Sequence, residues 1–242
     1  MAGADRPGTI STGTASALAP PWAARVTVIA LLVGTALAGL VWHATRLNQV
    51  DAWVMRWQEQ ARPHARGLAA VVAATLPAGI VLVTIVAGAT VAWRAGRRDA
   101  VVLAISAVPA TLLAEVVLKQ LVHRQWNGDP DLIFPSGHVA VTAAAAMTAV
   151  LLVRVVPAAA PIRVVAAYAG GVAVLLVAAA RLVETVHSVT DVVGGAITGL
   201  VVTLGSASAI TAWFGRPHRR ASSGGPVGSD AAPAGGAGQS RS

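Results

Sequence analysis

The stretch LAAVVAATLPAGIVLVTIVAGATVAW, residues 68–93, decides the fold because it contains no charged side chain. An α-helix needs about 20 predominantly apolar residues to cross the hydrocarbon core of a bilayer, and this stretch exceeds that length. Comparable stretches occupy residues 26–42, 100–118, 164–180 and 192–214. A sixth, residues 139–153, reaches spanning length if residues 136–138 form its first turn and Arg154 extends to the interface. The sequence therefore predicts an all-α integral membrane bundle of six transmembrane helices.

The composition agrees with a bilayer as the solvent. Apolar residues make up 55% of the 242-residue chain and charged residues 12%, whereas a soluble domain carries about 25% charged residues. The alternative is a soluble all-helical protein, but its helices would show a polar stripe that these segments lack. Tryptophan rings suit the headgroup layer, and those found at segment ends are Trp22, Trp42, Trp93 and Trp213.

The distribution of positive charge predicts the orientation of the helices. Of the 18 Lys and Arg residues, 11 fall on the side that holds both termini and 7 on the other, so we expect both termini in the cytoplasm. Residues 119–138 and 181–191 would then face outward at the cell membrane. The net charge of +8 does not indicate nucleic acid, because the positive residues are scattered between apolar segments. Without cysteine, the chain has no disulfide, thiolate nucleophile or iron–sulfur cluster.

The two ends of the chain differ in composition from the spans. Residues 1–21 and 215–242 are rich in Gly, Ala, Ser, Thr and Pro, which predicts disordered cytoplasmic tails around a domain of residues 22–214. Residues 36–38, Ala-Leu-Ala, resemble a signal-cleavage site. Their apolar surroundings exceed the usual core of about 7–15 residues, so we expect a retained helix.

A short amphipathic helix is predicted between the first two spans, lying in the outer interface. Apolar residues recur there at i, i+3, i+4 and i+7, namely Val50, Trp53, Val54 and Trp57. The remaining faces carry Asp51, Arg56 and Glu59. We expect the apolar face to pack over the bundle, and the alternative is that it guides lipid toward a site.

Ionisable groups are costly at a membrane boundary, so a cluster of them indicates function. The first cluster contains Glu115, Lys119, His123 and Arg124. Lys119 is the only lysine in the chain, which favours a need for a compact ammonium group there, although a snorkelling helix-end lysine is the alternative. Glu115 lies one turn earlier, and we expect it to pair with Lys119 in a structural role.

The second cluster is Pro135-Ser136-Gly137-His138, immediately before an apolar segment. Ser136 can cap that helix while free backbone N–H groups point at an anion. Gly137 would let a ligand approach the backbone closely. An ordinary helix cap is the alternative.

The third cluster contains Arg181, His187 and Asp191. If the last helix begins near His187, Asp191 lies one turn away and can accept the proton of one ring nitrogen, which leaves the other nitrogen nucleophilic. His138 can then protonate a leaving alkoxide as general acid. The cations expected to hold the three equatorial oxygens of a phosphoryl group are Lys119, Arg124 and Arg181.

A metal site is the competing interpretation of two histidines and an aspartate. Three nearby cations would repel a divalent ion, and no cluster of carboxylates is present to hold magnesium. We therefore expect neither a metal nor another cofactor.

Residues 115–199 resemble the type 2 phosphatidic acid phosphatase superfamily, which shares its active site with vanadium haloperoxidases. Its three motif blocks are Lys-x6-Arg-Pro, Pro-Ser-Gly-His and Ser-Arg-x5-His-x3-Asp. The second block is complete here, and the third keeps Arg181, His187 and Asp191 at the family spacing. Ala180 replaces the serine of the third block.

The first block departs further from the family pattern. Lys119 is present, but Trp126-Asn127 stands where the family has Arg-Pro. Arg124, two residues earlier, is the expected substitute. The residues that would contact the substrate phosphate are Lys119, Arg124, Ser136, Gly137 and Arg181.

The resemblance implies a metal-independent hydrolase of a lipid phosphate or pyrophosphate, with the site at the outer face of a six-helix bundle. In this mechanism His187 attacks phosphorus, Asp191 orients it, and His138 protonates the leaving group and then activates water. Expected substrates are phosphatidic acid, phosphatidylglycerol phosphate, or a polyprenyl phosphate or pyrophosphate, presented by membrane lipid. The alternatives are a head-group phosphotransferase with the same site and a non-catalytic lipid-phosphate binding protein.

Overall fold

The computed structural model describes residues 18–60, 63–125, 132–155 and 160–215. These residues form seven helices and no strand: α1 (Ala23–Leu40), α2 (Gln49–Glu59), α3 (Pro63–Arg94), α4 (Arg98–Val122), α5 (Gly137–Val155), α6 (Ala160–Val183) and α7 (Val189–Phe214). All except α2 are long and apolar enough to cross a membrane. The prediction of an all-α bundle with six spans is confirmed, and the chain is a multi-pass membrane protein.

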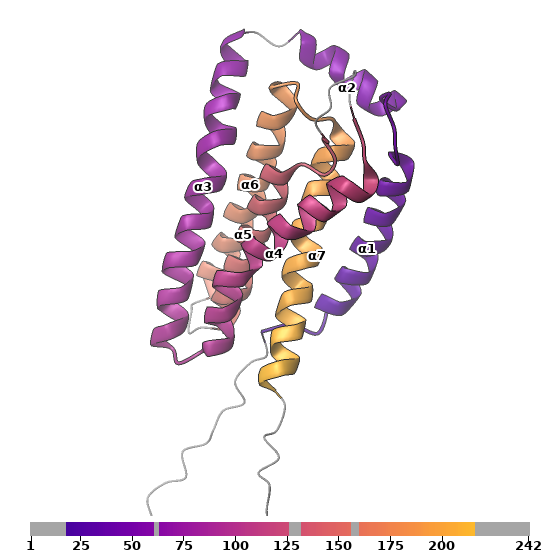
Figure 1. Cartoon of the computed structure of the whole chain (residues 1–242). Helices are drawn as coiled ribbons and strands as arrows, with labels where there is room; N and C mark the ends of the chain where they lie inside the picture. Colours follow the sequence, from indigo (N-terminus) through magenta and orange to yellow (C-terminus); the bar gives the residue numbers. More distant parts are fainter. Residues whose placement is uncertain (1–17, 61–62, 126–131, 156–159, 216–242) are drawn as a thin grey trace, which may run out of the picture.

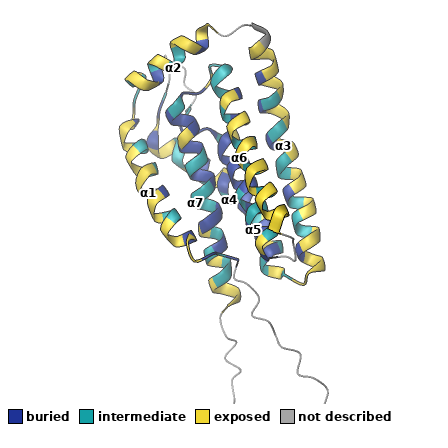
Figure 2. Ribbon diagram, turned by 180° about the vertical axis from the view of Figure 1, so that it is seen from behind, coloured by how far each residue is buried: buried dark blue, intermediate teal, exposed yellow. Residues whose placement is uncertain are grey.

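Helix α5 lies at the centre of the bundle, in contact with α3, α4, α6 and α7. Its apolar window is 61% buried, compared with 11% for α1 and 6% for α6. The outward faces of α1, α3 and α6 are largely exposed, whereas α5 and α7 each carry more buried residues than any other helix (Figure 2). Exposed apolar helix faces are the surfaces expected to meet lipid.

Helices α5 and α7 approach closely because glycine faces the α5 backbone. A Cβ atom at Gly199 would collide with backbone atoms of Ala140 and Ala144, and one at Gly195 would collide with the carbonyl of Ser136. Between helices in lipid, association depends on such close van der Waals packing. The start of α5 and the start of α7 are thereby held against each other.

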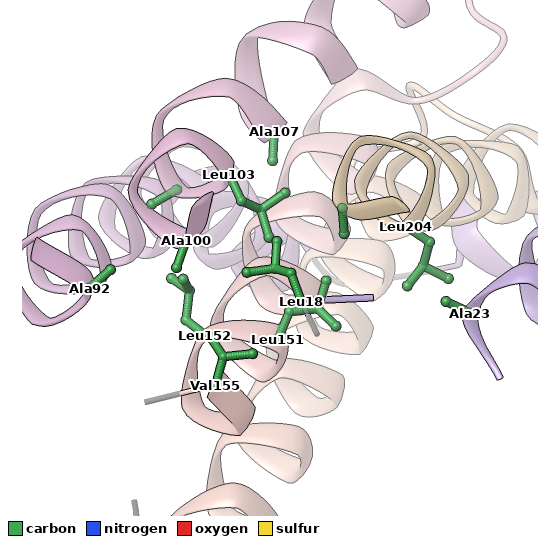
Figure 3. Packing of buried hydrophobic residues seen from close by; sticks show 12 residues of the cluster. Leu18, Ala23, Ala92, Ala100, Leu103, Ala107, Leu151, Leu152, Val155 and Leu204 are labelled. Atoms are coloured by element: carbon green, nitrogen blue, oxygen red, sulfur yellow. The ribbon is translucent and has the colours of Figure 1, made fainter. Parts of the chain in front are cut away.

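The main apolar core lies nearer the opposite end of the bundle, where Leu103, Leu151 and Leu204 are fully buried (Figure 3). Leu18, 1% exposed, belongs to this core, and the Ala19 N–H donates to Thr211 Oγ1 at 3.2 Å. Leu18 and Ala19 therefore pack with the helices, and the domain bounds of residues 22–214 stay a prediction. The remainder of the two expected tails, residues 1–17 and 216–242, lies outside the described residues.

The start of α1 and the end of α7 lie at one end of the bundle (Figure 1). Helix α2, the end of α4, the start of α5 and the turn between α6 and α7 lie toward the other end (Figure 1). The three clusters of ionisable residues are thus brought to one end of the molecule.

The amphipathic helix is present as α2, with the Asn48 side chain accepting from the Asp51 N–H at 2.9 Å as its N-cap. Its orientation differs from the expectation. Asp51 and Gln58 are fully buried, whereas Trp53 and Trp57 are 65% and 64% exposed. The expectation that the apolar face packs over the bundle is wrong, because buried partners exist for Asp51 and the indole rings face outward.

Candidate active site

A cavity of about 400 Å³ opens between α3, α4, the start of α5 and the turn before α7. One wall is apolar and includes Ala74, Pro77 and Leu112. The polar lining consists of Glu115, Lys119, Gly137, His138, Arg181 and His187. Five of the expected site residues therefore share one cavity, and three others, Arg124, Ser136 and Asp191, do not line it.

His187 precedes α7, because Ser188 is the N-cap and the helix begins at Val189. The imidazole is 7% exposed. Burial, reinforced by the positive charges of Arg181 and Lys119, lowers the pKa of His187 to about 3. The ring is consequently neutral near pH 7, which is the state in which a ring nitrogen can act as a nucleophile.

Asp191 is fully buried and makes a capping box with Ser188. Its Oδ2 accepts from the Ser188 N–H and Oγ–H, both at 2.8 Å, and its Oδ1 accepts from Arg124 Nη1 at 2.6 Å. The nearest approach to His187 is 4.0 Å, from Oδ2 to Nδ1, which exceeds hydrogen-bond length. Asp191 therefore lies beside His187 without the expected hydrogen bond, because the helix begins two residues later than expected and Asp191 caps it.

Both cations in the cavity are paired with carboxylates. Lys119 Nζ lies 2.7 Å from Glu115 Oε1, as the i, i+4 spacing predicted. Arg181 Nη1 lies 2.7 Å from Glu184 Oε2. Glu184 was not among the expected site residues, although its i, i+3 spacing from Arg181 indicates such a pair. Arg181 Nε is buried and has no hydrogen-bond partner. A buried donor without an acceptor is costly, so an anion in the cavity would relieve it.

The Pro-Ser-Gly-His block supplies the start of α5. Ser136 occupies the N-cap position, but its buried Oγ makes no hydrogen bond, so the expected side-chain cap is not formed. The Ser136 N–H instead donates to the Asp191 carbonyl at 3.0 Å and ties the two helix starts together. A Cβ atom at Gly137 would collide with the Glu115 carboxylate. The carboxylate thus lies at the N-terminus of α5, where helix geometry favours an anion.

Arg124 was expected to contact phosphate, but its side chain is 1% exposed and does not line the cavity. Its terminal nitrogens donate to Asp51, Asp191, Ser188 and Thr190. The N–H groups of this guanidinium group already donate to protein acceptors, whereas binding a phosphate would require free N–H donors. The family position of the missing arginine, residues 126–127, lies outside the described residues.

Within the described ranges, no three His, Asp or Glu side chains gather in a way that could hold a metal ion. Metal independence stays a prediction, since it depends on the reaction itself. The ionisable groups that line the cavity are two imidazoles, one ammonium group, one guanidinium group and the Glu115 carboxylate.

The described residues thus form a six-span membrane protein in which two histidines and two cations line one cavity. Residues 100–215 match the model of the PAP2 superfamily. The fold is similar to that of the first transmembrane PAP2 type phosphatidylglycerolphosphate phosphatase from Bacillus subtilis, with a TM-score of 0.63 and 22% identity over 80% of this chain and 98% of the other. A comparison with curated proteins found no significant match.

Proposed function

We propose that this chain is a membrane phosphatase that removes phosphate from a lipid phosphate or pyrophosphate through a phosphorylated His187. The observation that carries the proposal is the neutral, buried imidazole of His187 in a cavity that also contains Lys119, His138 and Arg181. The PAP2 assignment of residues 100–215 supports it, as does the fold shared with a phosphatidylglycerolphosphate phosphatase.

In the first step, a ring nitrogen of His187 attacks phosphorus, and the bond from phosphorus to the lipid oxygen breaks. Nδ1 is on the side of Asp191, so Nε2 is the attacking atom. His138, the other imidazole of the cavity, donates a proton to the leaving oxygen. The products of this step are the dephosphorylated lipid and phosphohistidine.

In the second step, neutral His138 takes a proton from water while the water oxygen attacks phosphorus. The bond between phosphorus and nitrogen breaks, inorganic phosphate leaves, and His187 returns to its neutral form. His138 is protonated again and ready for another cycle. No atom or proton is left over, so two imidazoles suffice for turnover.

Lys119 and Arg181 stabilise the charge on the phosphoryl oxygens. In the structure they are paired with Glu115 and Glu184, so a bound phosphate would compete with those carboxylates. The Lys119 side chain is 29% exposed and that of Arg181 16%, so neither pair is sealed from solvent. A phosphate dianion carries two negative charges, against one on each carboxylate, and can therefore compete for both cations.

The apolar wall of the cavity favours a lipid over a soluble phosphate ester. Ala74, Pro77 and Leu112 belong to the spanning helices α3 and α4, next to the phosphate-binding cations. A lipid could therefore place its phosphate against Lys119 while its chain remains in hydrocarbon. Candidate substrates are phosphatidic acid, phosphatidylglycerol phosphate and polyprenyl phosphates or pyrophosphates.

A phosphate-release screen of the purified protein against these lipids, with chelator present, tests the proposal. Wild-type protein should release phosphate, and ³²P should be trapped on it in an acid-labile, base-stable form. His187→Ala should abolish both signals, whereas His123→Asn is the matched control because His123 is exposed and asparagine tolerates its positive φ of 51°. Turnover by His187→Ala would contradict the mechanism, and transfer of phosphate to another acceptor would identify a phosphotransferase.

A further inference from the structure

We infer that Arg124 is a positioning residue for this reaction: together with Asp51 of α2, it fixes the Asp191 carboxylate beside His187 and does not bind substrate. The inference rests on the proposed function. Its basis is a buried hydrogen-bond network that joins three segments far apart in the sequence, residue 51, residue 124 and residues 188–191.

The backbone around Arg124 is held on both sides. His123 ends α4 in a left-handed conformation, the Gln125 N–H donates to the Ala44 carbonyl at 3.3 Å, and the Arg124 carbonyl accepts from the Ile133 N–H at 3.1 Å. The Arg124 side chain therefore extends from a backbone that is held in place. A rigid, planar fork on a fixed backbone is suited to setting the position of carboxylates.

The Arg124 side chain joins two buried aspartates. Nη2 donates to Asp51 Oδ2 at 2.9 Å, and Nη1 donates to Asp191 Oδ1 at 2.6 Å and to Thr190 Oγ1 at 2.5 Å. Asp51 and Asp191 are both fully buried. Removing the guanidinium group would leave two uncompensated carboxylates in the interior. Arg124 is therefore needed to keep Asp51 and Asp191 buried as carboxylates.

Asp51 caps α7 from outside that helix. Its Oδ1 accepts from the Thr190 N–H at 3.0 Å, and its Oδ2 accepts from Thr190 Oγ1 at 2.6 Å. Burial raises the pKa of Asp51, but the hydrogen bonds from Thr190 and Arg124 outweigh burial and lower the pKa overall. Asp51 is therefore a carboxylate, as a cap at the positive end of α7 should be.

Both oxygens of Asp191 are consequently fixed. Arg124 holds Oδ1, while Oδ2 faces Ser188 and lies 4.0 Å from His187 Nδ1. As positive charge develops on His187 during attack, the Asp191 carboxylate supplies a negative charge 4.0 Å from Nδ1. Loss of Arg124 would let the carboxylate rotate away and would weaken that stabilisation without touching the phosphate-binding groups.

Arg124→Lys and Asp51→Asn test the inference, because each weakens one link while preserving side-chain size. Both should lower kcat at least tenfold, and KM and the calorimetric affinity for vanadate should stay within about twofold. The double variant should lose no more than the worse single variant, since the two residues act through one network. A direct phosphate ligand would instead show a raised KM and weakened vanadate binding in Arg124→Lys, and that outcome would overturn the inference.

Arg97→Lys is the matched control, because Arg97 forms an ion pair with Asp99 at the other end of the bundle. It should leave kcat unchanged. A readout without turnover is nuclear magnetic resonance titration of ¹⁵N-labelled histidine, in which both network variants should raise the pKa of His187 from about 3 toward 6.5 as the site loosens. If no lipid is hydrolysed, the proposed function fails while this titration still decides the network; an unchanged His187 pKa in both variants would refute it.

Discussion

At the residue scale, His187 owes its chemistry to its surroundings more than to its place in a motif. Burial is the largest cause of its lowered pKa, and Arg181 and Lys119 add to it. The same two cations that would hold phosphate therefore also keep the nucleophile unprotonated. A phosphate bound between them would offset their charge, so the site couples binding of the anion to the state of the imidazole.

This coupling predicts how stability depends on pH. The pKa of His187 is about 3 in the folded protein and 6.5 for an unperturbed histidine. Between these pH values the unfolded chain therefore binds a proton at His187 and the folded protein does not. The stabilising contribution is complete above pH 6.5 and is lost as pH falls toward 3. His187→Asn removes the titration, so the difference in melting temperature between wild type and variant in detergent should change between pH 7 and pH 4.5 to the disadvantage of wild type. A difference that does not vary with pH would contradict the assignment.

Some site residues could be predicted from sequence because short spacing fixes them. The pairing of Glu115 with Lys119 follows from one helical turn, and the gathering of Lys119, His138 and His187 was implied by the family resemblance. The surroundings of Arg124 could not be predicted in this way. They depend on where α2 lies against α7, a contact across 73 positions between Asp51 and Arg124 that no local pattern encodes.

At the element scale, α2 shows what periodicity can and cannot establish. The recurrence of apolar residues correctly predicted a helix and identified which residues share a face. It did not establish which face is covered, because Asp51 is stabilised in the interior by a partner from the end of α4. The exposed indoles of Trp53 and Trp57 then form an outward face suited to the headgroup layer.

The outward face of α2 predicts a role in activity at a membrane. Replacing Trp53 and Trp57 together by serine should lower turnover of a long-chain lipid phosphate in vesicles severalfold, because α2 loses the indole rings that anchor it in the headgroup layer. Turnover of a short-chain lipid phosphate in detergent should change less. Trp93→Ser is the control, since Trp93 is 72% exposed near the other end of the bundle. Equal losses on both substrates would indicate misfolding of α2 and contradict an interfacial role.

The close approach of α5 and α7 predicts a contrast between two glycines of the same helix. A Cβ atom at Gly199 would collide with the α5 backbone, whereas one at Gly205 would meet nothing within 4 Å. Gly199→Ala should therefore lower the melting temperature in detergent and reduce activity, because the helix starts that carry His138 and His187 would separate. Gly205→Ala should be neutral or stabilise by up to about 1 kcal/mol, since alanine favours the helical backbone. Destabilisation by Gly205→Ala of the same size would argue against backbone contact as the cause.

At the scale of the whole molecule, the chain divides its work between the two ends of the bundle. The main apolar core, with Leu103, Leu151 and Leu204, also contains Ala23 at the start of α1. It therefore lies toward the end of the bundle where α1 begins and α7 ends (Figure 1). The buried ionisable groups gather at the other end, near the starts of α5 and α7: Asp51, Glu115, Arg124, His187 and Asp191 (Figure 1). Apolar packing at one end thus stabilises the bundle, and the other end can hold buried charges, which are costly, in a fixed arrangement.

Because the cavity lies at one end of the bundle, the membrane orientation determines on which side of the membrane the cavity opens. The positive residues predict that the end with both termini is cytoplasmic, so the cavity should face outward. Val186 is 43% exposed in the turn before α7, and Ala95 is exposed in the turn between α3 and α4 at the opposite end. Because the chain has no cysteine, Val186→Cys should react with an impermeant maleimide in intact cells and Ala95→Cys only after lysis. The reverse pattern would place the cavity in the cytoplasm, where the substrate would have to be a lipid phosphate of the inner leaflet.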